Sequence, residues 1–157
     1  MSDIRITIST RRGRATDRTS LEDVAVEAYL PYVDRLRGQR PAPMDTDYAA
    51  AITRDVVWIS EVDGQIAGFL VLVDQPGYTL LESVAVRPRW QGRGIGRRLI
   101  TIAEEHARAM GTNVVRLYTN AAMVENQGLY VRLGYVEVDR RVEDRFDRVF
   151  YEKVLVL

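Results

Sequence analysis

Cysteine is absent from this 157-residue sequence, and lysine and histidine occur once each, as Lys153 and His106. Without cysteine the chain has no disulfide bond, no thiolate nucleophile and none of the usual zinc frameworks. Long apolar runs are also missing. No segment approaches the length of a membrane-spanning helix, and the first residues, MSDIRITISTRRGR, contain no apolar signal-peptide core. We therefore expect a soluble cytoplasmic protein with no membrane partner and no metal.

An excess of charge of either sign is missing as well. Twenty-two Lys and Arg residues balance 22 Asp and Glu residues, which argues against a dedicated nucleic-acid-binding protein. The hydrophobic content of 46 % and charged content of 28 % are ordinary for a folded chain. The length fits one domain spanning 1–157, and no repeat, low-complexity run or linker divides it.

Turn signals and hydrophobic periodicity predict an alternation of strands and helices. Asp63-Gly64, between two apolar runs, is a strong hairpin signal, and Pro76-Gly77 marks the next turn. The order indicates an α+β or mixed α/β domain with a mainly antiparallel sheet. Strands are predicted at 4–8, 56–62, 65–73, 77–86, 113–119, 135–141 and 148–156, and helices at 17–30, 95–110 and 124–133, with a short one ending at Ile52.

Capping residues set the expected helix ends. Ser20 is placed to cap the helix at 17–30, Asp45 or Thr46 to cap the short helix, and Gly111 to end the long helix. Glu104 falls on the polar face of the long helix. Its apolar face includes the single histidine, which we therefore expect to pack rather than to catalyse: Ile95, Leu99, Ile102, Ala103, His106 and Met110.

Three glycines, Gly92, Gly94 and Gly96, alternate in the stretch RPRWQGRGIGRRL at 87–99, which also holds five arginines and no acid. The stretch lies between a predicted strand and a predicted helix. A helix N-terminus presents unpaired backbone N–H groups and positive dipole charge, so it is a ready anion site. Glycines would let a phosphate approach that backbone. The residues alone leave a phosphate-binding loop, a tight turn and a basic nucleic-acid-facing patch open.

The glycine spacing excludes two nucleotide-binding loops. A dinucleotide fingerprint needs G-x-G-x-x-G and an acid about 20 residues later, whereas here the pattern is G-x-G-x-G and residue 116 is arginine. A Walker A loop ends in G-K-[ST], whereas Gly96 is followed by Arg97 and Arg98.

Two motifs resemble those of the GNAT superfamily of N-acetyltransferases. VAVRPRWQGRGIGRRLI resembles motif A, Q/R-x-x-G-x-G/A, through Gln91, Gly94 and Gly96, after a strand ending in V-x-P. Downstream, NQGLYVRLGY resembles the second signature, a helix with a tyrosine followed by Gly-aromatic. The element order matches too, so the resemblance covers essentially the whole chain. It implies the acyl-CoA N-acyltransferase fold, with about seven strands in a mixed sheet flanked by helices.

The resemblance implies acetyl-CoA as acetyl donor, with no metal. The end of the strand at 78–86 would pair through its backbone with the pantetheine arm, at Val84, Ala85 and Val86. The strands at 78–86 and 114–119 would splay apart there. The motif residue Gln91 is carried over as cofactor-binding, and the pyrophosphate cradle carried over is Gly92, Arg93, Gly94, Ile95, Gly96 and Arg97.

The family often has an asparagine seven residues before the tyrosine, where this chain has Met123. Asn126, one helical turn before Tyr130, could replace that pantetheine contact. The resemblance also implies that Tyr130 faces the sulfur and acts as general acid. Packing without catalysis remains the alternative role for Tyr130.

Acetyl transfer needs a neutral amine, a stabilised oxyanion and a proton for the departing thiolate. Glu82 is the only acid in the strand TLLESVAV, and period-2 alternation places it on one face with Val84 and Val86. Burial there would raise the pKa of Glu82, which makes it the candidate base. A structural pairing with Arg116, or deprotonation through water alone, remains open. The backbone N–H of Val84 or a neighbour would stabilise the oxyanion.

The acceptor would meet segments 29–48 and 140–150, which are rich in tyrosine, phenylalanine and mixed charge. This suits a small amine, an amino-acid-like molecule or a protein amine, and the sequence does not choose among them. We expect an N-acetyltransferase; the alternative is a non-catalytic acyl-CoA-binding or sensing domain on the same fold. The family is often dimeric, which leaves a homodimer open.

Overall fold

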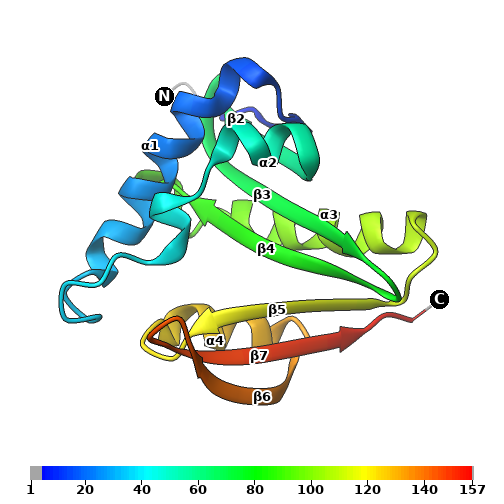
Figure 1. Ribbon diagram of the computed structural model, residues 1–157. Helices are drawn as coiled ribbons and strands as arrows, with labels where there is room; N and C mark the ends of the chain where they lie inside the picture. Colours follow the sequence, from blue (N-terminus) through cyan, green and yellow to red (C-terminus); the bar gives the residue numbers. More distant parts are fainter. Residues whose placement is uncertain (1–4, 157) are drawn as a thin grey trace.

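A seven-stranded mixed sheet forms the centre of the protein (Figure 1). The computed structural model describes residues 5–156. The strands lie in the order β1-β2-β3-β4-β5-β7-β6, and every neighbouring pair is antiparallel except β4 and β5. The order of the elements confirms the predicted fold class: β1 Ile8–Arg12, α1 Arg18–Tyr29, α2 Tyr48–Arg54, β2 Val56–Val62, β3 Gln65–Gln75, β4 Tyr78–Val86, α3 Ile95–Ala109, β5 Val114–Asn120, α4 Val124–Arg132, β6 Val136–Glu143 and β7 Phe146–Val154.

Two predicted turns connect the strands of the β2–β3–β4 meander. Asp63 and Gly64 both have positive φ, 50° and 82°, as a two-residue turn that matches strand twist requires. Gly77, with φ of 84°, makes the next reversal. Both turns are therefore confirmed.

Helices cover the two faces of the sheet separately. One apolar cluster joins α1 and α2 to β2 and β3 through residues such as Leu21, Tyr48 and Phe69. The other joins α3, α4 and the C-terminal strands through residues such as Leu99, Leu117 and Tyr130. Both clusters reach β4, so this strand is held from both sides.

The parallel pair β4–β5 separates at its carboxyl end. Their register runs only over Thr79–Leu81 with Val115–Leu117. Beyond it β4 continues to Val86 and β5 to Asn120, and the two diverge in Figure 1. The predicted splay is thus present, and it leaves one edge of residues 82–86 without a neighbouring strand.

A bulge interrupts β4 at Glu82. Val71 pairs with Ser83 whereas Leu72 pairs with Leu81, so Glu82 has no partner on β3. The extra residue breaks the alternation of side chains. Leu81 packs with α3, whereas Ala85, four residues on, packs with α1.

Two predicted boundaries are wrong because tertiary contacts decide them. The first strand lies at Ile8–Arg12 rather than 4–8, of which Ile4 is outside the described residues. Its position is fixed by Arg11, which donates to Glu61 at 2.6 Å and to Asp17 at 2.8 Å. Helix α1 begins at Arg18, so Ser20 lies inside it and does not cap it.

The cap of α2 is Asp47, not Asp45 or Thr46, since its carboxylate accepts the N–H of Ala50 at 3.1 Å. Gly111 has φ of 80° and ends α3 as predicted. Two residues differ in burial from the prediction for this helix. Met110 is exposed at the helix end, whereas Glu104 is buried and pairs with Lys153 of β7.

Candidate active site

The glycine loop adopts a backbone that only glycine enters easily. Gly92 and Gly94 have φ of 78° and 84°, and space around both is open, so the left-handed conformation itself is what requires glycine. Gly94 is the N-cap of α3 and provides no side-chain cap. The first N–H groups of this helix are therefore free to bind a ligand. Gly96 differs, since it is helical and a Cβ atom added there would lie 3.8 Å from Val86 Cγ2.

The arginines of this loop have different surroundings. The guanidinium groups of Arg89 and Arg93 lie over the Trp90 ring, 4.9 and 5.3 Å from its centroid. Arg98 bonds to Glu105 at 3.3 Å. Arg97 is the one whose side chain lines the adjacent cavity.

A cleft of about 460 Å³, which we call the glycine-loop cleft, opens beside α3. Its volume lies in the range of ligand sites, roughly 300–1,000 Å³. It brings together the predicted cofactor residues, apart from Arg93, and adds residues of α1 and α4. The lining includes Tyr29, Tyr32, Val84, Ala85, Val86, Trp90, Gln91, Gly92, Gly94, Ile95, Gly96, Arg97, Glu125, Asn126, Leu129 and Tyr130.

Two carbonyl groups on the free edge of β4 accept hydrogen bonds from side chains. Tyr29 Oη donates to the Val84 carbonyl at 2.9 Å, and Gln91 Nε2 donates to the Val86 carbonyl at 3.0 Å. Burial raises the pKa of Tyr29 well above its ordinary value, so its hydroxyl stays a donor. Because backbone direction alternates along a strand, the carbonyl of Ala85 between them faces β3.

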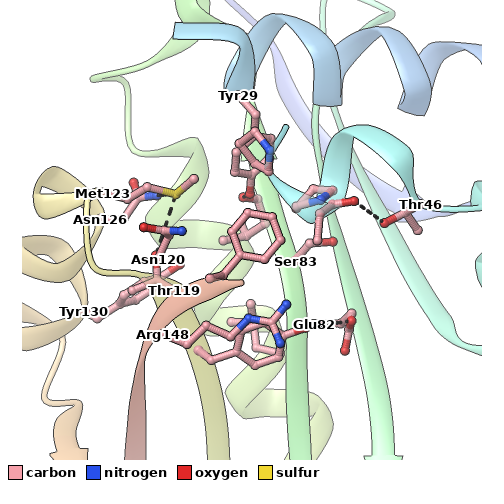
Figure 2. Close-up of a pocket in the computed structure, with 17 residues that line it drawn as sticks. Tyr29, Thr46, Glu82, Ser83, Thr119, Asn120, Met123, Asn126, Tyr130 and Arg148 are labelled. Carbon is pink, nitrogen blue, oxygen red and sulfur yellow. Dashed lines mark hydrogen bonds between the residues drawn. The ribbon is translucent and has the colours of Figure 1, made fainter. Parts of the chain in front are cut away.

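A second cavity, which we call the strand pocket, lies between β4, β5, β7 and the segment before α2 (Figure 2). Its volume is about 80 Å³. Both segments expected to meet the acceptor contribute to it, 29–48 and 140–150. Its lining is Tyr29, Pro41, Ala42, Pro43, Thr46, Leu81, Glu82, Ser83, Val84, Tyr118, Thr119, Asn120, Met123, Asn126, Tyr130, Phe146 and Arg148.

The two cavities meet where β4 and β5 separate. Four residues line both of them: Tyr29, Val84, Asn126 and Tyr130. Tyr130 packs beside the rings of Tyr135 and Tyr151, at centroid distances of 6.1 and 6.0 Å. Burial raises the pKa of Tyr130, so its phenol stays protonated at neutral and alkaline pH. Asn126 Nδ2 contacts Met123 Sδ at 3.8 Å and faces both cavities.

Glu82 lies in the strand pocket, but not on the face predicted for it. The bulge turns it away from Val84 and Val86, which pack against the α3 cluster. Its carboxylate accepts the hydroxyl of Tyr118 at 3.1 Å. The predicted alternative partner, Arg116, instead bonds to Glu152 at 2.8 Å.

Tyr118 and Arg148 are site residues that the sequence interpretation did not single out. Burial, followed by the charge of Glu82, raises the pKa of Tyr118 to about 12. Period-2 alternation along 114–120 places Tyr118 on the face opposite Leu117, and this signal could have identified it.

His106 is remote from both cavities and bonds through Nε2 to Asp74 at 2.9 Å. Within residues 5–156 no cluster of three or more metal-ligating side chains occurs. No helix in the described part of the chain is long and apolar enough to cross a membrane.

The splayed mixed sheet, with a glycine loop at the start of α3 and a cleft beside it, defines the class of acyl-CoA N-acyltransferase folds. Residues 13–135 match the Acetyltransferase (GNAT) family. This is well over half of the chain, so the chain belongs to that family, and the resemblance read from its two motifs is confirmed.

Two curated proteins are similar to part of the chain. An uncharacterized N-acetyltransferase of Methanocaldococcus jannaschii is 32% identical over 93 residues, covering 53% of this chain and 40% of that protein. The mycothiol acetyltransferase of Streptomyces avermitilis is 34% identical over 80 residues, covering 50% and 26%. The aligned part therefore spans less than half the length of either relative.

Solved structures match over nearly the whole chain. The PaiA N-acetyltransferase of Thermoplasma acidophilum, in complex with coenzyme A, has a TM-score of 0.79 at 20% identity, covering 94% of this chain and 99% of that chain. The ribosomal-protein-S18-alanine N-acetyltransferase of Escherichia coli has a TM-score of 0.78 at 18% identity, covering 96% of both chains. At these identities the likeness confirms the fold.

Proposed function

We propose that the protein is an acetyl-CoA-dependent N-acetyltransferase that moves an acetyl group directly to a primary amine. The observation that carries the proposal is the meeting of two cavities at Tyr130 and Val84. A donor in one cavity and an acceptor in the other would come together there. The relatives named as N-acetyltransferases, and the neighbour with coenzyme A, support the same activity.

The glycine-loop cleft fits the donor. Uncapped N–H groups at the start of α3, with Arg97 beside them, suit a pyrophosphate. The edge of β4 that lacks a strand neighbour suits the extended pantetheine arm. Gln91 and Tyr29 donate hydrogen bonds to two carbonyls of this edge, which the arm would approach. Asn126 lines the same path.

Acetyl-CoA supplies an activated acetyl group as a thioester, so no protein nucleophile is needed. The acceptor nitrogen bonds to the acetyl carbon as the carbon–sulfur bond breaks. Glu82 takes the proton of the amine, directly or through water, and Tyr118 orients its carboxylate. Tyr130 donates a proton to the sulfur, and the backbone N–H of Val84 stabilises negative charge on the acetyl oxygen.

A panel of amines with acetyl-CoA, followed by thiol release, tests the activity. We expect release with at least one amine. Because general acid–base groups contribute about 10²–10⁴-fold, Glu82→Gln should lower kcat/KM by about 100-fold or more. Glu105→Gln, an exposed acid on α3 outside both cavities, is the matched control and should retain the rate. Coenzyme A binding without release from any amine would favour the sensing domain instead.

A further inference from the structure

Arg148 of β7 lies at the base of the strand pocket (Figure 2). Its guanidinium carbon is 4.7 Å from the ring centroid of Tyr118 and 5.6 Å from that of Phe146. The side chain is only 12% exposed. Aromatic contacts therefore fix the plane of a guanidinium group that is largely removed from bulk water.

Most hydrogen-bond donors of this guanidinium have no partner among residues 5–156. Nη1 donates to Glu143 at 3.1 Å and lies 3.9 Å from Asp144, beyond hydrogen-bond range. Glu143 is shared, since it also accepts from Arg141 at 2.6 Å. Nε and Nη2 of Arg148 make no hydrogen bond to any described residue. Donors of a largely desolvated cation gain most from an anionic acceptor, and two parallel N–H groups match a carboxylate.

The same pocket contains a group of the opposite charge. Glu82 accepts the hydroxyl of Tyr118, and Arg148 lies over the ring of the same tyrosine, so carboxylate and guanidinium both contact Tyr118. Glu82 is the proposed base for the acceptor amine. Arg148 has no part in that step, and its charge would repel a simple cationic amine. A molecule that carries both an amine and a carboxylate would match both groups.

The pocket is also small, and one of its walls is held in place. Residues 41–46 form one wall, and this wall is anchored because the Tyr48 hydroxyl donates to the carbonyl of Pro43 and Met44 is buried. Together with a volume of about 80 Å³, this favours a small molecule over a folded protein or a long peptide.

We infer that the acceptor is a small amine that bears a carboxylate, of the amino-acid type, and that Arg148 binds this carboxylate. The inference rests on the proposed N-acetyltransferase activity and specifies its substrate class. Arg148 is then the residue that selects the acceptor, whereas Glu82 takes the proton from the acceptor's amine.

Matched substrate pairs test this inference. A set of amino acids, each beside the carboxamide of the same skeleton, is assayed with acetyl-CoA by thiol release. We expect the free acids to be preferred in kcat/KM by about 10–100-fold, the range of a charge-assisted bidentate bond. Arg148→Gln should reduce this acid-to-carboxamide ratio to near one. Arg108→Gln removes an exposed arginine of α3 that lines neither cavity, and it should keep the ratio.

The outcomes separate the two proposals. If carboxamides, simple amines or short peptides react as well as the free acids in the unmodified protein, the transferase stands and the carboxylate assignment is overturned. A ratio that survives Arg148→Gln would overturn the role of Arg148. If no member of any pair releases thiol, the proposed function itself fails. Because the substrate pairs are compared in the unmodified protein, this test does not depend on whether a variant folds.

Discussion

Tyr130 is the residue at which the two cavities meet, and its hydroxyl makes no hydrogen bond to any described residue. Its ring is fixed by Tyr135 and Tyr151, while Val84 and Asn126 line both cavities with it. A phenol held rigidly beside an opening is well placed to meet a ligand atom there. This separates Tyr130 from Tyr29, whose hydroxyl is already used by the Val84 carbonyl.

Tyr130→Phe is expected to lower kcat by about 100-fold through loss of the general acid, with little change in KM for acetyl-CoA. Tyr151→Phe is the matched control, since its hydroxyl bonds to Gln127 at 3.3 Å and lines neither cavity. Because burial raises the pKa of Tyr130 above its ordinary value of 10.0, the acid form persists as pH rises. A pH profile of kcat should show no alkaline loss below pH 10. An unchanged kcat in the variant would remove Tyr130 from the catalytic role.

Asp17 is a single residue on which the join between β1 and α1 depends. It is 6% exposed, and its carboxylate accepts from Arg11 Nη1 and Nη2 at 2.8 and 2.9 Å and from the Arg14 N–H at 2.7 Å. The bonds to Arg11, followed by the Arg14 N–H, outweigh burial and lower the pKa of Asp17 below 3.8.

Asp17→Asn should lower the free energy of unfolding at pH 7 by about 2 kcal/mol, the range of hydrogen bonds to charged groups. A lowered folded-state pKa gives stability that is present above the unfolded value of 3.8 and is lost as pH falls through the lower folded value. The gap between unmodified protein and variant, measured by urea unfolding, should therefore be constant near neutrality and shrink below 3.8. Exposed Asp34 gives the control variant Asp34→Asn, with little effect. A gap that widens in acid would contradict this account.

At the scale of elements, the start of α3 combines a strained turn with an open helix end. Gly94 holds the left-handed N-cap conformation, whereas Gly96, two residues on, is already helical. The same residue type therefore serves different purposes within one motif. The bulge in β4 is a second local feature that shapes the site. Its one extra residue directs Glu82 toward Tyr118.

Gly94→Ala and Gly96→Ala should have opposite effects on stability. Alanine at φ of 84° costs about 1–2 kcal/mol. At position 96 a Cβ would meet only Val86 at 3.8 Å, an ordinary contact, and helix propensity would stabilise the variant by up to about 1 kcal/mol. Urea unfolding midpoints of the two purified variants provide the measurement. Equal destabilisation would show that something other than φ requires glycine at 94.

The whole molecule consists of two sheet halves joined by a short parallel contact. Only Thr79–Leu81 and Val115–Leu117 connect β4 with β5, and the glycine-loop cleft reaches the opening that remains. Arg35 and Glu125 span this opening with two bonds of 2.8 Å, and Arg35 holds the pKa of Glu125 at about 2. A ligand that fills the cleft would add contacts between the halves.

Coenzyme A should therefore stabilise the whole fold. At a concentration 100-fold above its Kd, binding to the native state alone contributes about 2.7 kcal/mol. For a chain of this size that raises Tm by about 5–10 °C, measurable by thermal denaturation. NAD is the control ligand, because the glycine spacing lacks the dinucleotide fingerprint, and it should leave Tm unchanged. An equal shift with NAD would contradict the assignment of the cleft.

Local patterns in the sequence were sufficient to predict the fold and the glycine loop that lines one of the two cavities. The order of eleven helices and strands, the Asp63-Gly64 hairpin and the glycine loop follow from turn chemistry and periodicity, which act over a few residues. The two motifs identified the family, and their tyrosine, Tyr130, lines the glycine-loop cleft.

Tertiary structure alone decided where Glu82 points, where β1 and α1 begin, and which residues share the strand pocket. A bulge is set by the register of two strands, so no pattern within 78–86 reveals it. Arg148 and Tyr118 share a pocket with Glu82 only because β7 and β5 lie beside the separated end of β4. Spacing along the chain determined the glycine loop, since its conformation is local backbone geometry. The strand pocket is built from segments far apart in sequence, and only folding brings their charges together.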